Sequence, residues 1–274
     1  MPSRAVHLEP LVSMDTSSFR NALARFEAIR GKVGSLRSDQ GTNFVAARRQ
    51  LGELQLSDLG DQIPWRLNAP HASHHGGAWE RKIGSVRRVF EASLALVSNR
   101  CLSRDEFTTF MAEAAAIVNN TPLWSNPNHP NDPVPLSPAM LLTLRDFPNP
   151  APRESFSEKD LASYGERRYR RIQYLSDQFW GRWRAEYIQT LSKRHKWKTR
   201  KACLRAGDVV LLRDKQVPRN EWPMGIVAHA KVSSDGLVRS ATIRLPPLRG
   251  GSPRSMERAI SDLVLLVPAG EHGC

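Results

Sequence analysis

The stretch that decides the fold runs over residues 37–84. Residues 37–44 read Arg-Ser-Asp-Gln-Gly-Thr-Asn-Phe, and residues 76–84 read Gly-Gly-Ala-Trp-Glu-Arg-Lys-Ile-Gly. Asp39 follows a short apolar run, which predicts a strand over residues 33–36 that delivers this carboxylate at its end. Glu80 follows a glycine-rich loop and opens a helical pattern. If the fold brings these two carboxylates together, they can share divalent metal ions, which is how phosphodiesters are cut and joined.

The first half of the chain alternates short apolar runs with amphipathic helical patterns. Asp15 or Thr16 can cap a helix that ends before Gly31, and Ser103 with Glu106 forms a capping-box pattern at the start of another helix. Further strands are predicted over residues 5–12 and 64–68, and further helices over residues 44–54 and 78–98. This alternation predicts an α/β domain.

Two helical patterns carry apolar stripes that predict a packed core. The stripe of residues 78–98 is Ile83, Val86, Phe90, Leu94 and Val97, and the stripe after Ser103 is Phe107, Phe110, Met111, Ala114, Ile117 and Val118. Glu80 shares a helix surface with Arg87 and Arg88, so the carboxylate suits a metal ion and the arginines suit a phosphate backbone. An ordinary solvated helix with Glu and Arg pairs is the alternative.

The charge of the chain is unevenly distributed. The 274 residues carry a net charge of +13. Residues 1–150 hold 16 of the 40 Lys and Arg and 14 of the 27 Asp and Glu, so residues 151–274 hold the remaining 24 and 13, a net charge of +11. A basic half of this kind is the footprint of a module that binds a polyanion. A basic soluble surface, or one that meets an acidic protein, is the alternative.

The second half contains a long basic helix and a series of short strands. Residues 164–200 predict a helix with apolar residues on one side and with Arg167, Arg168, Arg170, Arg171, Arg182 and Arg184 on its other faces. The cluster that ends it is basic with one tryptophan, which fits phosphate contact and stacking: Lys193, Arg194, Lys196, Trp197, Lys198, Arg200 and Lys201. A partner-packing helix or a nuclear localisation signal is the alternative.

Strands predicted over residues 207–212, 222–227, 238–245 and 260–267, separated by Asp-Gly and Pro turns, indicate a small antiparallel barrel. Basic residues lie along its strands and loops: Arg213, Lys215, Arg219, Lys231, Arg239, Arg244, Arg249, Arg254 and Arg258. Ahead of this half, prolines are dense between residues 122 and 152, which predicts a semi-rigid connector.

The cysteines, the histidines and the hydropathy of the chain indicate whether disulfides, a metal site or membrane spans are expected. The three cysteines are scattered without a CxxC pair, which favours an intracellular protein without a disulfide framework. His71, His74 and His75 lie close together, but without cysteines or carboxylates at zinc spacing we expect no dedicated metal site there. No apolar run is long enough to span a membrane, so no membrane partner is expected.

Three sequence blocks resemble, in family order, the retroviral-type integrase of BEL/Pao long-terminal-repeat retrotransposons. They read Arg-Ala-Val-His-Leu-Glu at residues 4–9, Ser-Asp-Gln-Gly-Thr-Asn-Phe at 38–44 and Gly-Ala-Trp-Glu-Arg at 77–81, with Asn-Ala-Pro at 68–70. The resemblance implies an incomplete ribonuclease H-like core over residues 1–125 that lacks its first strands. It further implies a Pro-rich connector over 126–160 and, over 161–270, the basic helix with a small SH3-like β-barrel.

The resemblance also implies chemistry, partners and location. Family members bind Mg²⁺ or Mn²⁺ through three carboxylates and transfer DNA strands, and Asp39 and Glu80 match the second and third carboxylates. The first belongs upstream of residues 4–9, a position that Glu9, Asp15 and Glu27 do not match. Double-stranded DNA is the expected partner, a homo-oligomer is possible in the family, and the expected location is nuclear.

Two hypotheses follow from this incomplete set of carboxylates. In the first, the chain is a fragment of an integrase from a truncated gene or a decayed element, and it is inactive alone. In the second, it is an integrase-derived DNA-binding protein without catalysis, which uses its basic second half. A protein–protein scaffold is a third class, and it would be favoured if the chain failed to bind DNA.

Overall fold

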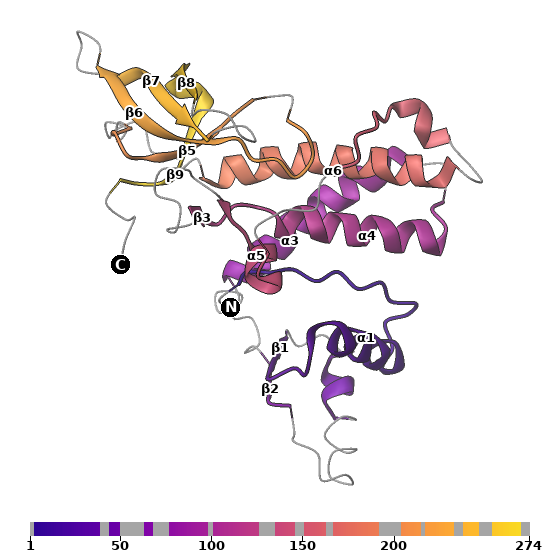
Figure 1. Cartoon of the computed structure of the whole chain (residues 1–274). Helices are drawn as coiled ribbons and strands as arrows, with labels where there is room; N and C mark the ends of the chain where they lie inside the picture. The colour runs from indigo at the N-terminus through magenta and orange to yellow at the C-terminus, as the bar shows by residue number, and fades with distance from the viewer. Residues whose placement is uncertain are drawn as a thin grey trace. The chain divides into compact units, whose positions relative to one another are not determined.

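The computed structural model describes residues 3–38, 44–49, 63–67, 77–97, 101–125, 135–145, 151–162, 167–191, 204–214, 217–232, 238–246 and 254–269. The chain forms two compact units (Figure 1). We call His7–Arg87 the small unit, and Met1–Val6 with Arg88–Cys274 the large unit. The predicted mixture of helices and strands is confirmed, with an antiparallel sheet of five strands in the large unit.

Helix α1 of the small unit, Thr16–Arg30, begins and ends as its sequence predicts. The carboxylate of Asp15 accepts a hydrogen bond from the backbone N–H of Ser18 at 2.7 Å, which satisfies one of the free donors of the first turn. Gly31 ends the helix with φ of 87°, a left-handed conformation that glycine adopts without steric cost. Both caps predicted for this helix are therefore confirmed.

Two short strands of the small unit pair in parallel. Strand β1 is Leu36–Ser38 and strand β2 is Trp65–Leu67, with Arg37 opposite Arg66. The strand predicted over residues 33–36 thus lies slightly later in the chain and ends at the residue before Asp39. The strand predicted over residues 64–68 is confirmed.

An aromatic cluster packs beside these strands. The ring of Phe19 on α1 lies 5.5 Å from that of Trp65 and 5.6 Å from that of Phe44, between centroids. The indole N–H of Trp65 donates to the hydroxyl of Ser38 at 3.0 Å. Residues 44–49 are helical, as predicted for the described part of residues 44–54. These contacts fix the end of β1 against α1.

The strand predicted over residues 5–12 is wrong, because none of these residues joins a β-ladder. The backbone of Val6, in the large unit, pairs with the side chain of Asn119 instead. The N–H of Val6 donates to Oδ1 of Asn119 at 2.7 Å, and Nδ2 of Asn119 donates to the carbonyl of Val6 at 2.7 Å. A buried side-chain amide therefore supplies the two partners that a neighbouring strand would have supplied.

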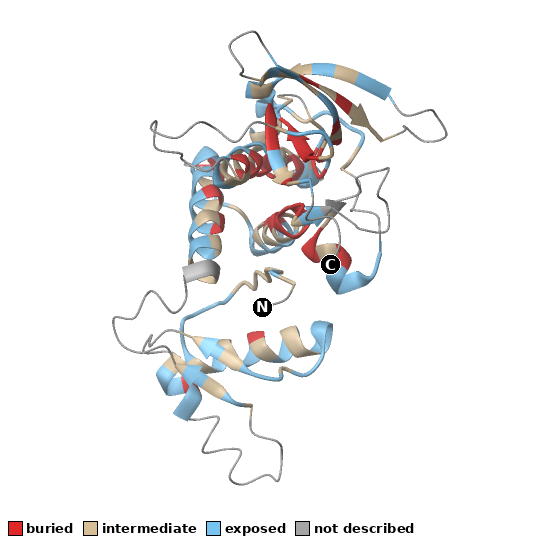
Figure 2. Ribbon diagram, turned by 90° about the vertical axis from the view of Figure 1, so that its left-hand side faces the viewer, coloured by how far each residue is buried: buried red, intermediate tan, exposed pale blue. Residues whose placement is uncertain are grey.

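Helix α4, Arg104–Asn119, begins with the predicted capping box. The hydroxyl of Ser103 accepts from the N–H of Glu106 at 3.2 Å, and the N–H of Ser103 donates to Oε2 of Glu106 at 2.8 Å. Helix α6, Arg168–Leu191, packs along α4, and Figure 2 shows buried residues gathered on both helices. Most of the predicted stripe of α4 is buried: Phe110, Ala114, Ile117 and Val118.

Helix α3, Gly77–Leu94, continues into a 3-10 turn, Ala95–Val97. The ring of Phe90 stacks on that of Phe110 with centroids 4.7 Å apart and contacts Phe179 of α6 at 6.3 Å. Part of the stripe predicted for this helix is wrong, because Ile83 is exposed. The buried positions are Val86, Val89, Ser93 and Val97.

The region between α4 and α6 contains short elements. Strands β3, Trp124–Ser125, and β4, Pro135–Leu136, pair antiparallel. Helix α5, Pro138–Thr143, follows, with the hydroxyl of Ser137 accepting from the N–H of Met140 as its N-cap. A 3-10 turn, Glu158–Ala162, precedes α6. The proline-dense sequence therefore holds ordered elements among its described residues.

The antiparallel sheet has the strand order β8-β7-β6-β5-β9. Its strands are β5 (Val209–Leu212), β6 (Met224–Val232), β7 (Val238–Leu245), β8 (Arg254–Ala259) and β9 (Leu263–Val267). The core on one face consists of Val210, Leu212, Val227, Ala241, Ile243 and Leu263. Gly225 allows the strands to pack, because a Cβ there would lie 2.2 Å from Cγ2 of Ile243. Residues 260–262, predicted as strand, form a 3-10 turn instead.

None of the helices that the structure describes is long and apolar enough to cross a bilayer.

Candidate nucleic-acid interface

The structure describes one of the two carboxylates predicted to bind metal, Glu80. Asp39 lies outside the described residues, one position after the end of β1. Glu80 is half-buried in the first turn of α3. Within the described ranges no group of three His, Cys, Asp or Glu side chains could hold a metal ion. The approach of Asp39 to Glu80 stays a prediction, and His71, His74 and His75 also lie outside the described residues.

Of the two arginines that follow Glu80 on α3, Arg87 is exposed. Arg88 is also exposed over 67% of its side chain, and its Nη2 lies 3.4 Å from Oε1 of Glu186 on α6. A surface ion pair of this kind contributes little to stability, but its carboxylate occupies the guanidinium that a phosphate would otherwise contact. The predicted phosphate contact at Arg88 therefore competes with a carboxylate of the chain itself.

The basic cluster predicted to contact nucleic acid lies outside the described residues, because α6 is described only to Leu191. Its members are Lys193, Arg194, Lys196, Trp197, Lys198, Arg200 and Lys201. Within α6 itself, the prediction that all arginines lie on outer faces is wrong for two of them. Arg171 and Arg184 are buried.

Arg171 pairs with a buried carboxylate of α4. Its Nη1 lies 3.4 Å from Oε1 of Glu106, and the two side chains are 2% and 5% exposed. Burial alone would raise the pKa of the Glu106 carboxyl, but hydrogen bonds from Ser103 and the charge of Arg171 outweigh burial and lower it. This ion pair ties the start of α4 to α6, so Arg171 is a structural residue and is withdrawn from any nucleic-acid surface.

Arg184 fixes the segment that follows β5 onto α6. Its Nη2 donates to the carbonyl of Leu212 at 2.7 Å, and its Nη1 donates to the carbonyl of Asp214. Burial lowers the pKa of Arg184, against the opposing charge of Asp214. The indole N–H of Trp180 adds a bond to the carbonyl of Val217 at 3.1 Å. Together these bonds attach the β5–β6 connection to the helix.

Arg219, one of the basic residues predicted along the strands and loops of the barrel, is also buried. Its guanidinium donates to the carbonyl and the side-chain oxygen of Gln173, and it lies 3.5 Å from Oδ1 of Asp177. The pKa of Asp177 is raised by burial and by the charge of Glu113, which outweigh the opposing charge of Arg219. Because Arg219 lies in a loop of the sequence, the sequence alone does not indicate that its side chain is buried against α6.

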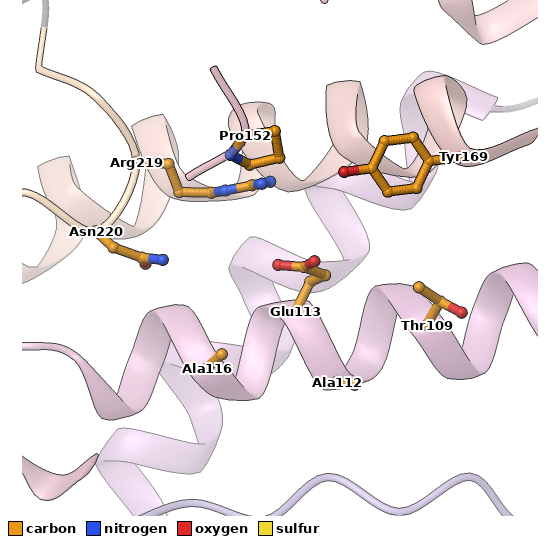
Figure 3. A pocket seen from close by; sticks show the side chains of 8 residues that line it. All are labelled: Thr109, Ala112, Glu113, Ala116, Pro152, Tyr169, Arg219 and Asn220. Carbon is orange, nitrogen blue, oxygen red and sulfur yellow. The ribbon is translucent and has the colours of Figure 1, made fainter. Parts of the chain in front are cut away.

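A hollow lies beside this network, between α4, the start of α6 and the turn at Arg219 (Figure 3). In Figure 3 Glu113 points across it toward the guanidinium of Arg219, and the hydroxyl of Tyr169 points the same way. The remaining lining residues are small or uncharged: Thr109, Ala112, Ala116, Pro152 and Asn220. The arginine of the hollow already donates to Gln173, and the carboxylate of Glu113 lines the same hollow.

The exposed basic residues of the sheet lie mainly on β7 and β8 and next to β5. Arg205, Arg239 and Arg254 are exposed. Arg258 lies 3.3 Å from Asp214, and Lys231 lies 3.9 Å from Glu257. Lys215 and Arg249 lie outside the described residues. Among the described residues, Arg205, Arg213, Arg239 and Arg254 are therefore the exposed arginines that the sheet and its flanking segments contribute to the candidate interface of the large unit, and Arg87 belongs to the small unit.

Comparison with known proteins adds one match. Residues 167–266 match the model of a protein family described as a family of unknown function (DUF5641). The match spans α6 and the five-stranded sheet up to the penultimate residue of β9. A search of curated proteins gave no match. The helix and the sheet that Arg184 and Arg219 join are thus the part of the chain that is similar to the family model.

Proposed function

We propose that this chain is the carboxyl-terminal part of a BEL/Pao retrotransposon integrase that binds double-stranded DNA and does not transfer strands alone. The observation that carries the proposal is the set of ordered sequence blocks around Asp39 and Glu80. The end of β1 directly before Asp39, and the position of Glu80 in the first turn of α3, support it. Asp39 follows the carboxyl end of a strand, which is where open α/β sheets bind their ligands.

The finer folds belong to the same proposal. A parallel strand pair beside helix α1 supports a ribonuclease H-like core for the small unit. In the sheet, four strands follow one another, and β9 returns to pair with β5 after the 3-10 turn Ile260–Asp262. That strand order supports an SH3-like barrel for the last part of the large unit.

The character of the basic surface favours binding to the DNA backbone. The exposed arginines are suited to phosphates, whereas the five strands contain no Phe, Tyr or Trp on which bases would stack. Contacts of this kind position a duplex without reading its sequence. We therefore expect sequence-independent binding whose affinity falls steeply as salt rises.

The metal ions implied by the resemblance, Mg²⁺ or Mn²⁺, would be held by Asp39 and Glu80 and would activate the attacking oxygen. Carboxylate oxygens are the ligands that these ions prefer. The described residues supply Glu80 alone, without two further ligating side chains beside it. The described part of the chain therefore does not complete a two-ion site, and we assign no catalytic step to it.

Fluorescence anisotropy with a labelled duplex tests DNA binding. Replacing Lys196, Lys198, Arg200 and Lys201 by Gln is expected to weaken binding and to flatten the dependence of log affinity on log salt, because phosphate contacts are lost. The matched control removes the same charge from the small unit by replacing Arg20, Arg30, Arg48 and Arg49 by Gln. Equal losses in both variants would show that net charge alone acts, and absent or salt-insensitive binding would overturn the proposal.

Strand transfer tests the absence of catalysis, which the proposed integrase fragment shares with its alternative, a non-catalytic integrase-derived DNA-binding protein. We expect the purified chain to join no donor DNA ends with Mg²⁺ or Mn²⁺, and we expect Asp39→Asn and Glu80→Gln to leave duplex binding unchanged. Metal-dependent joining that disappears in Asp39→Asn would show an active enzyme and would contradict the proposal. Nuclear accumulation of a fluorescent fusion, lost in the Lys196, Lys198, Arg200 and Lys201 variant, tests the proposed nuclear location.

A further inference from the structure

The hollow of Figure 3 combines apolar walls with a few polar groups. Its volume is about 390 Å³, which lies within the range of small-molecule sites. Ala112, Ala116 and Pro152 form the apolar part of its lining. The carboxylate of Glu113 and the hydroxyl of Tyr169 point into it from α4 and α6. All of its lining residues belong to the large unit.

Glu113 is the charged group of the hollow that can receive a ligand. Its Oε1 accepts from Nε2 of Gln173 at 3.3 Å, and among the described residues its Oε2 accepts no hydrogen bond. The guanidinium of Arg219 is less accessible, because its side chain is 2% exposed and is held by Gln173 and Asp177. The hollow therefore presents a carboxylate oxygen to a ligand that donates hydrogen bonds.

The charges around the hollow leave a negative excess. With both carboxyls ionised, Glu113 and Asp177 carry two negative charges against the single positive charge of Arg219. Burial is the largest cause of the raised pKa of Asp177, and the charge of Glu113 raises it further against Arg219. A cation in the hollow offsets this excess, whereas an anion adds to it. The sign of the charge here is thus opposite to the net charge of the chain, which is +13.

We propose that the hollow binds a guanidinium or ammonium group on an aliphatic stem, as found in arginine, lysine and linear amines. The cationic head pairs with the carboxylate of Glu113, and the stem lies along Ala112, Ala116 and Pro152. The ring of Tyr169, which is 51% exposed, attracts the same cation through its face. This site uses none of the residues proposed to bind DNA or metal, so either proposal can fail without the other.

Isothermal titration calorimetry of the whole chain with two blocked amino acids tests the charge of the head group. N-acetyl-arginine amide carries a guanidinium without terminal charges, and N-acetyl-citrulline amide has the same shape with a neutral urea group. We expect the arginine derivative to bind at least about tenfold more tightly, because a hydrogen bond to a charged group replaces a neutral one. Equal affinity of the two compounds, or no binding of the arginine derivative, would overturn the proposal.

Substitutions then locate the site. Glu113→Gln keeps an oxygen that can accept from Gln173, so its thermal stability should stay close to that of wild type, and it should lose the preference for the arginine derivative. Glu91→Gln is the matched control, because it removes the same charge from an exposed position of α3 in the large unit. Tyr169→Leu should weaken binding about threefold, whereas Tyr169→Phe keeps the ring and the affinity. A preference that survives in Glu113→Gln would contradict the assignment.

The source of the cationic group is found by competition against the arginine derivative. Agmatine carries the guanidinium on a free stem, and the blocked peptide Gly-Gly-Arg-Gly-Gly carries it on a backbone. A peptide that binds at least as tightly as agmatine assigns the site to a side chain of a basic polypeptide. A peptide that binds more weakly assigns it to a free linear amine. If neither compound displaces the arginine derivative, the proposal is wrong.

Discussion

The buried ion pair between Glu106 and Arg171 offers a direct test of how the large unit is held together. Glu106→Gln removes the negative charge and keeps an oxygen that can accept from the N–H of Ser103, so the helix cap is preserved. What is lost is one charged partner of a guanidinium 3.4 Å away. The substitution therefore isolates the charge interaction from the cap.

The expected loss is large because both side chains are almost fully buried. At 3.4 Å and an effective dielectric of about 20, two unit charges attract by about 5 kcal/mol. Removal of one partner of a buried pair usually costs about 3–5 kcal/mol, since the other charge stays desolvated. We expect a loss of this size in the free energy of unfolding, measured by urea denaturation with the fluorescence of the buried tryptophans.

Adding Arg171→Met to Glu106→Gln supplies the control. Because it removes the stranded charge and keeps an apolar side chain of similar length, the double variant should recover at least half of the loss. The pH dependence has a defined sign. The pKa of Glu106 is lowered from 4.5, so its contribution is complete above that pH and is lost as pH falls through the lower, folded-state pKa. A loss below about 0.5 kcal/mol, or no recovery in the double variant, would refute this account.

Three further predictions concern charged groups of the same unit. Since the pKa of Asp177 is raised, its contribution is complete below its ordinary pKa and is lost as pH rises through the folded value. The gain in the free energy of unfolding of Asp177→Asn over wild type, measured by urea denaturation, should therefore be larger at pH 7 than at pH 3. Arg184→Met should cost about 2–4 kcal/mol by leaving two carbonyl groups without their donor, yet anisotropy of the folded variant should show unchanged DNA affinity. Glu186→Gln should tighten duplex binding less than about tenfold by releasing Arg88, and Arg88→Gln should abolish that gain.

Local chemistry made part of the fold predictable. The caps at Asp15 and Ser103 depend on residues within a few positions, and both form as expected. Strand β8 was missed because its sequence, Arg-Ser-Met-Glu-Arg-Ala, has no apolar alternation, as suits an edge strand with charged side chains. The extended segment at Val6 was mistaken for a strand because its partner is the side chain of Asn119, more than a hundred residues away.

The sequence indicated which basic residues could belong to the candidate site, but it did not indicate which of them are exposed to solvent. Arg171 and Arg184 were predicted on the helix faces away from the apolar stripe, and Arg219 along the strands and loops of the barrel. Each one has acceptors that only the tertiary structure supplies. Helix α6 contacts both α4 and the sheet, so its buried arc is wider than a single apolar stripe. Trp180 and Ile188 flank the predicted stripe in the sequence, and both are buried. These two apolar residues could have indicated the wider buried face of the helix.

The packing of α6 also shows what the segment that matches the family model depends on for its core. The family match begins at residue 167, so it contains α6 and the sheet but not α4. In this chain Phe179 of α6 lies against Phe110 of α4, and Arg171 forms an ion pair with Glu106. The matched segment is therefore one half of a shared core. Residues 167–266 alone would therefore leave Phe179 and Arg171 without the side chains of α4 that they contact in this chain.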